Sequence, residues 1–275
     1  MRPTVKSIIL WGVAVILGYV VMYYQRQTGP TYPVAGEKRV GTTLISYSLI
    51  RTYHCGSPAA VRIVVPDTSV SGECSFRRFK SYDKWSVEPM QRSGDTLIAM
   101  LPALESAGKT MYQVTLKQGS NSYLLTGNPV ILRYKGEVPP FVLISHILFI
   151  CLAILLSTRT GLEAIFNGKH LYLYTWLTVI FLGLSVLILG PILQKYAFGE
   201  FWTGWPVGHD LTDNKSVIAF LCWLITLVIL SRKREKKIWP VIAMVITIVV
   251  FLIPHSLKGS EIDYTKEAPA SEISR

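Results

Sequence analysis

The sequence predicts an α+β membrane protein in which about five transmembrane helices carry an antiparallel β-sandwich, inserted between the first helix and the second. Three observations lead to this fold class. Five apolar runs occur in the chain, each close to the ~20 residues that a helix needs to cross the hydrocarbon core of a bilayer. Only 16% of the 275 residues are charged, whereas soluble domains carry about 25%. Between the first two runs, about one hundred residues show the short strands and frequent turns of a single β domain.

The apolar runs divide the helical part into an N-terminal anchor and a four-helix unit. The first run ends without the small-residue pattern of a signal-peptide cleavage site, so residues 1–25 are expected to remain as a transmembrane anchor. The other runs predict a four-helix transmembrane unit at residues 139–256, followed by a polar tail at residues 257–275. The runs are Ser7–Tyr24, Pro140–Ser157, Leu171–Gln194, Ser216–Ser231 and Ile238–Pro254.

The basic residues between the runs predict the orientation. Arg2 and Lys6 precede the first run, Arg159 and Lys169 fall in the connection between the second and third runs, and the block Arg232–Lys237 precedes the fifth. Five crossings place these segments on one side, which the positive-inside rule makes cytoplasmic. The β domain and the C-terminal tail are then extracytoplasmic. The formal net charge of +11 includes this dense block beside a membrane helix, which favours contact with the lipid bilayer over nucleic-acid binding.

The extracytoplasmic domain is expected to span residues 26–138. Short β-rich stretches alternate there with turn sequences such as Cys-Gly-Ser-Pro and Arg-Ser-Gly-Asp. Several short strands at this spacing are typical of an antiparallel sandwich. The predicted strands are Thr42–Tyr53, Ala60–Val65, Cys74–Phe79, Thr96–Leu101, Met111–Leu116, Ser122–Leu125 and Val130–Tyr134.

Parts of the chain resemble known groups of proteins. Trp85–Met90, Ser93–Pro102 and Ala107–Leu116 resemble bacterial fibronectin-type-III or immunoglobulin-like modules in the placement of their aromatic and turn residues. Gly204–Lys215 and Ile253–Ser256 are similar to sequences of uncharacterised bacterial inner-membrane proteins. The resemblance implies an immunoglobulin-like periplasmic domain on a protein of the bacterial inner (plasma) membrane. It brings no activity, cofactor or catalytic residue.

The four cysteines divide between the two parts of the chain. Cys55 and Cys74 fall in the exported domain, where oxidation is permitted, and each is close to a predicted strand end. We expect them to form a disulfide, the alternative being two separate buried thiols. Cys151 and Cys222 lie inside apolar runs and are expected to act as small hydrophobic residues.

Histidines and aspartates gather at the outer end of the predicted helices. His146 follows the start of the second run by six residues, or about 9 Å at 1.5 Å per residue. An aromatic, glycine-rich loop at residues 195–215 is expected to fold against the same end. Polar groups within a membrane are costly unless they pair or bind a ligand, so this cluster is the leading candidate site. Its candidate metal ligands are His146, His209, Asp210, Asp213 and His255.

Three kinds of cofactor fit these side chains. Imidazoles with a carboxylate suit a transition metal such as zinc, iron or copper. Two of the histidines would instead ligate a b-type haem between helices. A carboxylate-rich variant that combines Asp210 and Asp213 with Glu261 and Asp263 would suit calcium.

The same residues also have a structural interpretation. Asp213, or Thr212 before it, is placed to cap the fourth helix. His146 can bond to a neighbouring helix, as polar residues within membranes often do. His54 is expected at the surface of the β domain and His170 at a membrane interface.

Three functions are therefore open. In the first, the protein is a membrane component whose β domain binds other membrane or periplasmic proteins, or helps to assemble a membrane complex. In the second, the outer cluster makes it a metal- or haem-dependent membrane protein. In the third, it is a sensor or transport accessory protein. No catalytic residue is assigned, because no nucleotide-binding loop, hydrolase elbow or zinc-protease motif occurs in the chain.

Overall fold

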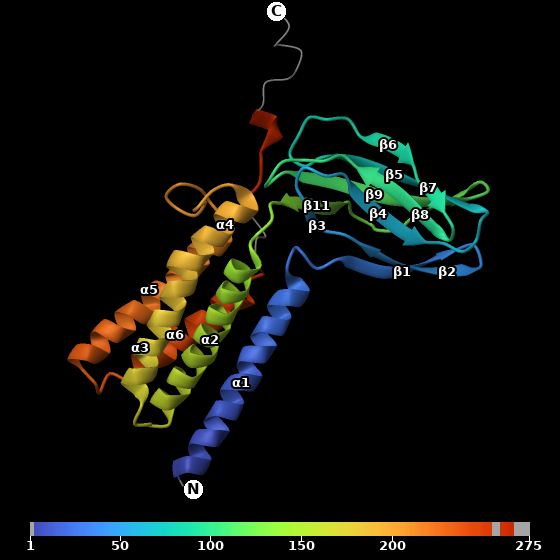
Figure 1. The fold of residues 1–275 in the computed structure, drawn as a ribbon. Coiled ribbons are helices and arrows are strands. Elements are labelled where there is room, and N and C mark those ends of the chain that lie inside the picture. Colours follow the sequence, from blue (N-terminus) through green and yellow to red (C-terminus); the bar gives the residue numbers. More distant parts are fainter. Residues whose placement is uncertain (1–2, 255–258, 267–275) are drawn as a thin grey trace, which may run out of the picture. The chain divides into compact units, whose positions relative to one another are not determined.

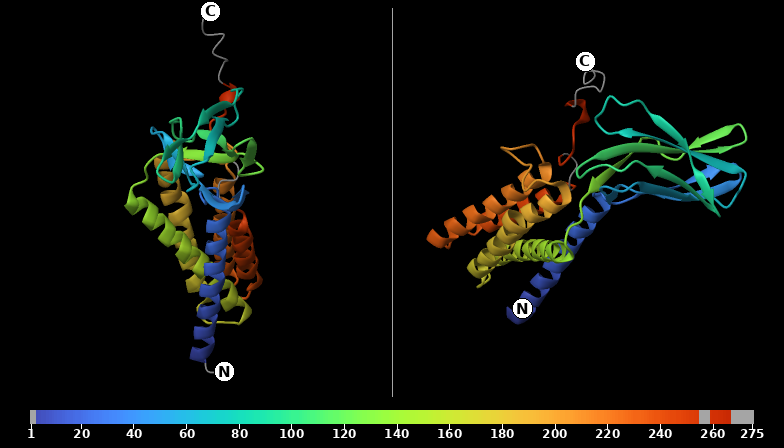
Figure 2. Two further views of the ribbon diagram at one scale, coloured as in Figure 1. Left: turned by 90° about the vertical axis from the view of Figure 1, so that its right-hand side faces the viewer. Right: turned by 45° about the horizontal axis from the view of Figure 1, so that its top comes forward.

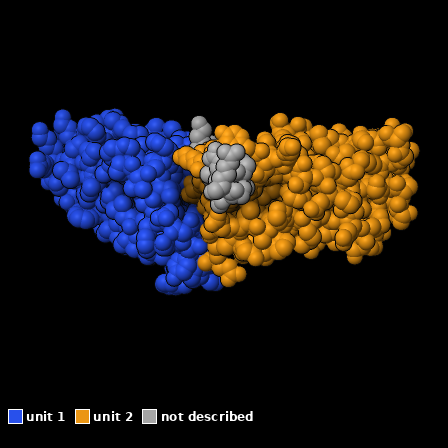
Figure 3. Space-filling view, turned by 90° about the horizontal axis from the view of Figure 1, so that it is seen from above, with its two compact units in different colours: residues 1–29, 138–259 blue, residues 30–137, 260–275 orange. Residues whose placement is uncertain are grey.

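The chain forms two compact units (Figure 3). The computed structural model describes residues 3–254 and 259–266. A helical unit is built from residues 1–29 and 138–259, and a β unit from residues 30–137 and 260–275. The β unit is therefore inserted in the sequence between the first helix and the second, as the fold class predicts.

Within its described residues, the helical unit contains four helical segments that are long and apolar enough to cross a membrane, so it fits a multi-pass membrane protein. The third of these segments runs through α3, a π-helical stretch and α4 without a break. The last helix has only 15 residues, or about 22 Å, which is shorter than the hydrocarbon core of about 30 Å. The helices are α1 (Pro3–Thr28), α2 (Pro140–Ile165), α3 (Leu171–Gly183), α4 (Gly190–Phe198), α5 (Leu211–Arg232) and α6 (Ile238–Leu252).

Local sequence explains where several helices begin, end or widen. Pro140 opens α2, a position where a proline loses no helical hydrogen bond. Pro191 cannot donate a backbone hydrogen bond to the preceding turn, and the π-helical segment Leu184–Leu189 comes directly before it. The cap of α5 is Asp210, whose carboxylate accepts the backbone N–H of Thr212 at 2.7 Å. The expectation that Thr212 or Asp213 provides this cap is therefore wrong.

The helices pack along one another, as both views of Figure 2 show. Their shared core includes Ile154 of α2, Leu182 of α3, Trp223 of α5 and Met244 of α6. A buried hydrogen bond joins Trp223 Nε1 to Thr247 Oγ1 over 2.8 Å and links α5 to α6. Since lipid is as apolar as these side chains, close packing and polar contacts between helices stabilise the bundle.

The described part of the β unit forms three sheets. A six-stranded sheet has the order β3-β11-β9-β5-β6, with β10 also pairing with β9, and two smaller sheets have the orders β4-β8-β7 and β1-β2. All pairings are antiparallel except that between β11 and β3. The strands are β1 (Val34–Val40), β2 (Thr43–Leu49), β3 (Thr52–His54), β4 (Ala59–Val64), β5 (Val70–Arg78), β6 (Ser86–Pro89), β7 (Gln91–Ser93), β8 (Thr96–Leu101), β9 (Lys109–Gln118), β10 (Asn121–Leu124) and β11 (Val130–Lys135).

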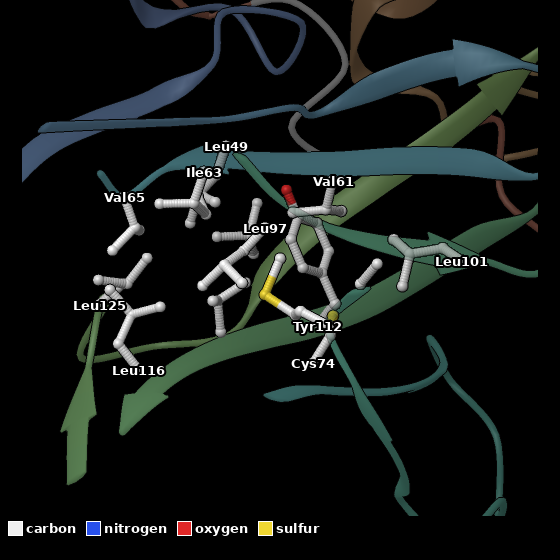
Figure 4. Packing of buried hydrophobic residues seen from close by; sticks show 14 of the residues in the cluster. Leu49, Val61, Ile63, Val65, Cys74, Leu97, Leu101, Tyr112, Leu116 and Leu125 are labelled. Atoms are coloured by element: carbon white, nitrogen blue, oxygen red, sulfur yellow. The ribbon is translucent and has the colours of Figure 1, made fainter. Parts of the chain in front are cut away.

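One hydrophobic core unites the three sheets (Figure 4). Leu49 of β2, Val61 of β4, Leu97 of β8 and Tyr112 of β9 belong to the same buried cluster. The alternation of buried and partly exposed residues along β9 follows the two-residue period of a strand. Tyr112 also donates its hydroxyl to the carbonyl of Ile50 at 2.8 Å, which satisfies the polar end of a buried ring.

The structure modifies the predicted strands in two ways. The stretch Thr42–Tyr53 is divided into β2 and β3, and the second of these pairs in parallel with β11. Strands β1, β6 and β7 are additional. They escaped prediction because they are short or rich in polar residues, and all four residues of β6 are exposed.

The segment Ser260–Lys266 belongs to the β unit. Its Ile262 N–H donates to the carbonyl of Ala107 at 3.3 Å. Glu261 forms ion pairs with Lys109 and Lys80. Part of the predicted polar tail is therefore held against the β unit by charged and main-chain contacts.

Candidate functional site

The predicted outer cluster is only partly assembled. His146 contacts Ser185 of the π-helical segment, with 3.3 Å between Nδ1 and Oγ. This contact matches the structural interpretation in which His146 bonds to a neighbouring helix. His209 is exposed in the loop before α5, and His255 lies outside the described residues. Within residues 3–254 and 259–266, no group of three or more histidine, cysteine, aspartate or glutamate side chains is arranged to hold a metal ion.

Asp210 and Asp213 serve instead to order the loop between α4 and α5. Asp213 accepts the backbone N–H of Thr203 at 2.9 Å, and the side chains of both aspartates also accept from the Thr203 hydroxyl, at 3.3 Å for Asp213 and 3.4 Å for Asp210. Gln194 of α4 donates to the same hydroxyl at 2.6 Å. A Cβ on Gly204 would lie 2.8 Å from that of Asp213, so only glycine fits this close approach. The carboxylates of Asp210 and Asp213 therefore hold the loop between α4 and α5 in place.

Among the described residues, the four carboxylates proposed for calcium are not part of any group of side chains that could hold a metal ion. Asp263 accepts the backbone N–H of Thr265 at 3.1 Å. The side chains of Lys80 and Lys109 already neutralise Glu261, so its charge is satisfied without a metal ion.

The predicted disulfide between Cys55 and Cys74 is not formed, because both residues are free thiols. Cys74 lies on β5, whereas Cys55 follows β3, and two strands separate β3 from β5 in the sheet. Three strand spacings amount to about 14 Å, whereas a disulfide needs Cα atoms within about 7 Å. Cys74 is fully buried, and burial raises the pKa of its thiol to about 12. It therefore behaves as a hydrophobic core residue.

At the opposite end of the bundle, the structure contains a buried ion pair that was not predicted from the sequence. Arg159 was expected in a polar connection, but α2 continues to Ile165 and buries it. Its guanidinium pairs with Glu163, one helical turn further along, and the two residues are 2% and 3% exposed. The signal in the sequence was the opposite charges at positions i and i+4, which lie on the same face of a helix.

Three helices enclose this ion pair. The Arg159 guanidinium carbon lies 5.4 Å from the ring centre of Trp11 on α1 and 5.1 Å from that of Tyr174 on α3. Glu163 also accepts the backbone N–H of His170 at 3.0 Å, immediately before α3. Gly168 lies so close to the Glu163 carboxylate that any side chain there would collide with it. The pair thus joins α1, α2 and α3 through charge, aromatic and main-chain contacts.

Side chains from two other helices satisfy the last carbonyls around the end of α6. Gln25 of α1 donates its amide to the carbonyls of Phe251 and Ile253, the latter at 2.9 Å. Lys215 of α5 is buried and donates to the same Ile253 carbonyl. Because the last carbonyls of a helix have no partner within it, these contacts satisfy polar groups that would otherwise be costly in an apolar environment.

In the β unit, exposed apolar side chains lie on the edge strand β6 and in the segment directly before it. Among the strands that the structure describes, β6 pairs only with β5. Tyr82 and Val87 are 82% and 56% exposed, and Trp85 lies between them in the sequence with 38% of its surface exposed. The guanidinium carbon of Arg77 lies 5.2 Å from the ring centre of Trp85 and holds that ring beside the strand. Tyr82, Trp85 and Val87 are called the β6 edge surface below.

Comparison with protein-family models, curated proteins and solved structures finds no match to the chain.

Proposed function

We propose that the protein is an integral membrane component whose β unit binds an extended segment of another membrane or exported protein along β6. The observation that carries this proposal is the β6 edge surface, where an edge strand lies next to exposed aromatic and aliphatic side chains. Adding a strand to such an edge is a recurring mode of peptide recognition, in which main-chain hydrogen bonds provide affinity and side chains provide specificity.

The pairing with β5 determines which main-chain groups of β6 are available. Met90 N–H donates to the carbonyl of Gly72 at 2.8 Å, and Glu88 lies opposite Cys74. In an antiparallel pair, hydrogen-bonded and non-hydrogen-bonded positions alternate. Val87, opposite Ser75, is therefore a position whose N–H and C=O point away from β5. A bound strand would use these two groups.

The surroundings of β6 favour a short, defined contact. Pro89 has no N–H, which limits how far a partner strand could extend along the edge. Arg78 and Asp83 form an ion pair with 2.8 Å between Nε and Oδ2, which holds the turn that presents Tyr82. The partner is thus expected to place one or two apolar side chains against Tyr82, Trp85 and Val87.

The proposal includes a location and an orientation. We place the protein in a bacterial inner membrane, with its N-terminus in the cytoplasm and the β unit outside. The basic residues at one end of the helices, including Lys6, Lys169 and the block Arg232–Lys237, support this orientation. We also infer that α6 crosses the membrane and that the three sheets close as a sandwich of the immunoglobulin-like type. The core shared by the three sheets supports the inference that they close as a sandwich.

The test is site-specific photo-crosslinking in cells that express the full chain. A photoreactive amino acid replaces Tyr82, and a second variant carries it in place of Leu44, which is 55% exposed on β2. We expect a discrete adduct with one membrane or exported protein from position 82 and none of the same mass from position 44. The crosslinked protein is then identified and purified for binding measurements.

The decisive variant is Val87→Pro, with Val87→Ile as its matched control. Proline removes an N–H that makes no bond to β5, so the midpoint of thermal unfolding should stay close to that of the unmodified protein. Isoleucine keeps an apolar, β-branched side chain at the docking surface and retains the N–H. We expect Val87→Pro to weaken binding at least about fivefold, the loss of one hydrogen bond of about 1 kcal/mol, and Val87→Ile to bind normally. Equal binding by all three proteins would overturn the proposal.

A further inference from the structure

A cavity lies at the basic end of the helical unit, between the ends of several helices. Its volume is about 220 Å³. Lys169 and Leu171 line it from the start of α3, and Leu230 lines it from the end of α5. Arg234 and Lys237 come from the connection between α5 and α6. The cavity is therefore bounded by two inter-helix connections that are far apart in the sequence.

Three cationic side chains line this cavity, and two of them are held by contacts with neighbouring residues. The guanidinium carbon of Arg234 lies 3.5 Å from the ring centre of Tyr172, which places the guanidinium against the aromatic face. Lys237 donates to Asn167 Oδ1 at 2.8 Å. Lys169 adds a third positive charge. These contacts fix Arg234 and Lys237 beside the cavity, where Arg234 remains exposed.

No carboxylate is among the described residues that line the cavity. Glu163, a few residues before Lys169, is buried and pairs with Arg159. Its other oxygen accepts the His170 N–H. The three cations at the cavity are therefore not neutralised by an acidic group in its wall.

The backbone adds to the positive potential. α6 begins at Ile238, directly after Lys237, and has no side-chain cap and no acidic residue in its first turn. The first N–H groups of a helix and its dipole favour an anion. The start of α6 therefore acts in the same direction as the three side chains, whereas the start of α3 already has the Glu163 carboxylate at the His170 N–H.

The position and the remaining wall of the cavity identify the kind of anion. Leu171 and Leu230 are buried apolar residues in that wall. The cavity lies where membrane-spanning segments end, which is the depth of lipid headgroups. Basic pockets between helices at a membrane surface are typical binding sites for anionic lipid headgroups. We propose that this cavity binds the phosphate group of an anionic membrane phospholipid, with Lys169, Arg234 and Lys237 as its ligands.

The test uses the full chain in nanodiscs of phosphatidylcholine, with and without phosphatidylglycerol. Native mass spectrometry then counts phosphatidylglycerol molecules that stay bound after transfer to mild detergent. The test variant is Arg234→Gln/Lys237→Gln. The matched control is Lys233→Gln/Lys236→Gln, which removes the same charge from the same basic block at positions that do not line the cavity.

We expect the unmodified protein and the control to retain phosphatidylglycerol and the test variant to lose it. Each cavity cation should contribute about fivefold in affinity, or about 1 kcal/mol, so the test variant should bind roughly thirtyfold more weakly. All three proteins should show a single cooperative unfolding transition in phosphatidylcholine alone, which shows that the variants are folded. Equal losses by both variants, or no retained lipid in the unmodified protein, would overturn the proposal.

A separate arm distinguishes a lipid from a soluble anion. Inorganic phosphate or glycerol 3-phosphate is added to the protein in phosphatidylcholine nanodiscs, and thermal stability is measured. A stabilisation equal to that by phosphatidylglycerol would assign the cavity to a soluble phosphate and overturn the lipid assignment. A clearly smaller effect supports it, because the apolar wall then contributes to binding.

Discussion

Removal of the Glu163 charge is expected to be the most damaging small change in the helical unit. Glu163→Gln retains the size of the side chain but leaves the buried Arg159 guanidinium without its counter-ion. Loss of one partner of a buried ion pair costs about 3–5 kcal/mol. The rings of Trp11 and Tyr174 still contact the guanidinium after the substitution, and each contact stabilises a cation by about 1–2 kcal/mol. We therefore expect a loss near the lower limit, about 3 kcal/mol of unfolding free energy.

A double-mutant cycle isolates the interaction. Arg159→Met removes the cation and is expected to cost about as much as Glu163→Gln, because it leaves a buried carboxylate. The double variant contains neither charge, so its loss should be smaller than the sum of the two single losses by at least about 2 kcal/mol.

The assay is reversible unfolding of the purified full chain in mixed micelles with increasing denaturing detergent. Lys233→Gln, an exposed position at the end of α5, serves as the control and should change stability by less than about 0.5 kcal/mol. A single-variant loss below about 1 kcal/mol, or additive losses in the double variant, would refute the account of a buried, mutually dependent pair.

Two further predictions follow from close packing and from charge. In Gly161→Ala, the new Cβ would lie 2.7 Å from that of Met244 on α6, so we expect a loss of about 1–3 kcal/mol of unfolding free energy in the same assay. Gly12→Ala serves as the control and should not destabilise the protein, because nothing lies within 4 Å of its new Cβ. Equal losses in the two variants would contradict the packing argument. In the β unit, burial alone would raise the pKa of Glu261, but hydrogen bonds from Lys109 and Lys80 bring this pKa below its ordinary value of 4.5. A depressed carboxylate pKa stabilises the folded state above the ordinary pKa and ceases to do so as the pH falls through the folded-state value. Hydrogen exchange of residues 260–266 should therefore be slow at neutral pH and, after correction for the intrinsic rate, accelerate below about pH 4.5. In Glu261→Gln, the same residues should exchange fast at both pH values. A pH-independent exchange rate in the unmodified protein would contradict the role of the Glu261 ion pairs.

The elements with a strong local pattern could be predicted from the sequence. The start of α2 at Pro140 and that of α3 at Leu171 agree with the predicted runs. β8 has its predicted bounds, Thr96–Leu101. The end of α2 was misplaced because charged residues were taken as the end of the apolar run, whereas the helix continues through Arg159 and Glu163. In the sequence, two opposite charges on one helix face look the same as charges in a solvated connection. Only the packing of a neighbouring helix over the pair shows that it is buried.

The candidate site was harder to predict, because its residues were chosen by type and by position along separate helices. Asp210 and Asp213 do come together, but around Thr203, whose main-chain and hydroxyl groups they bind. Cys55 and Cys74 shared a compartment and a strand-end position, yet the strand order separates them. Strand order depends on contacts between distant segments, which a single sequence does not reveal.

The sequence by itself determined that the chain has helices long and apolar enough to cross a membrane and an inserted β domain, because hydrophobicity along a helix and alternation along a strand depend on residues close together in the chain. Only the tertiary structure decided which polar groups meet. It paired Arg159 with Glu163 and placed the rings of Trp11 and Tyr174 against the Arg159 guanidinium. It also brought Lys169 to the same cavity as Arg234 and Lys237. It also placed β6 at an edge of its sheet. Such sites arise where segments distant in the sequence pack together, so their charges and exposed groups acquire a role only in the folded chain.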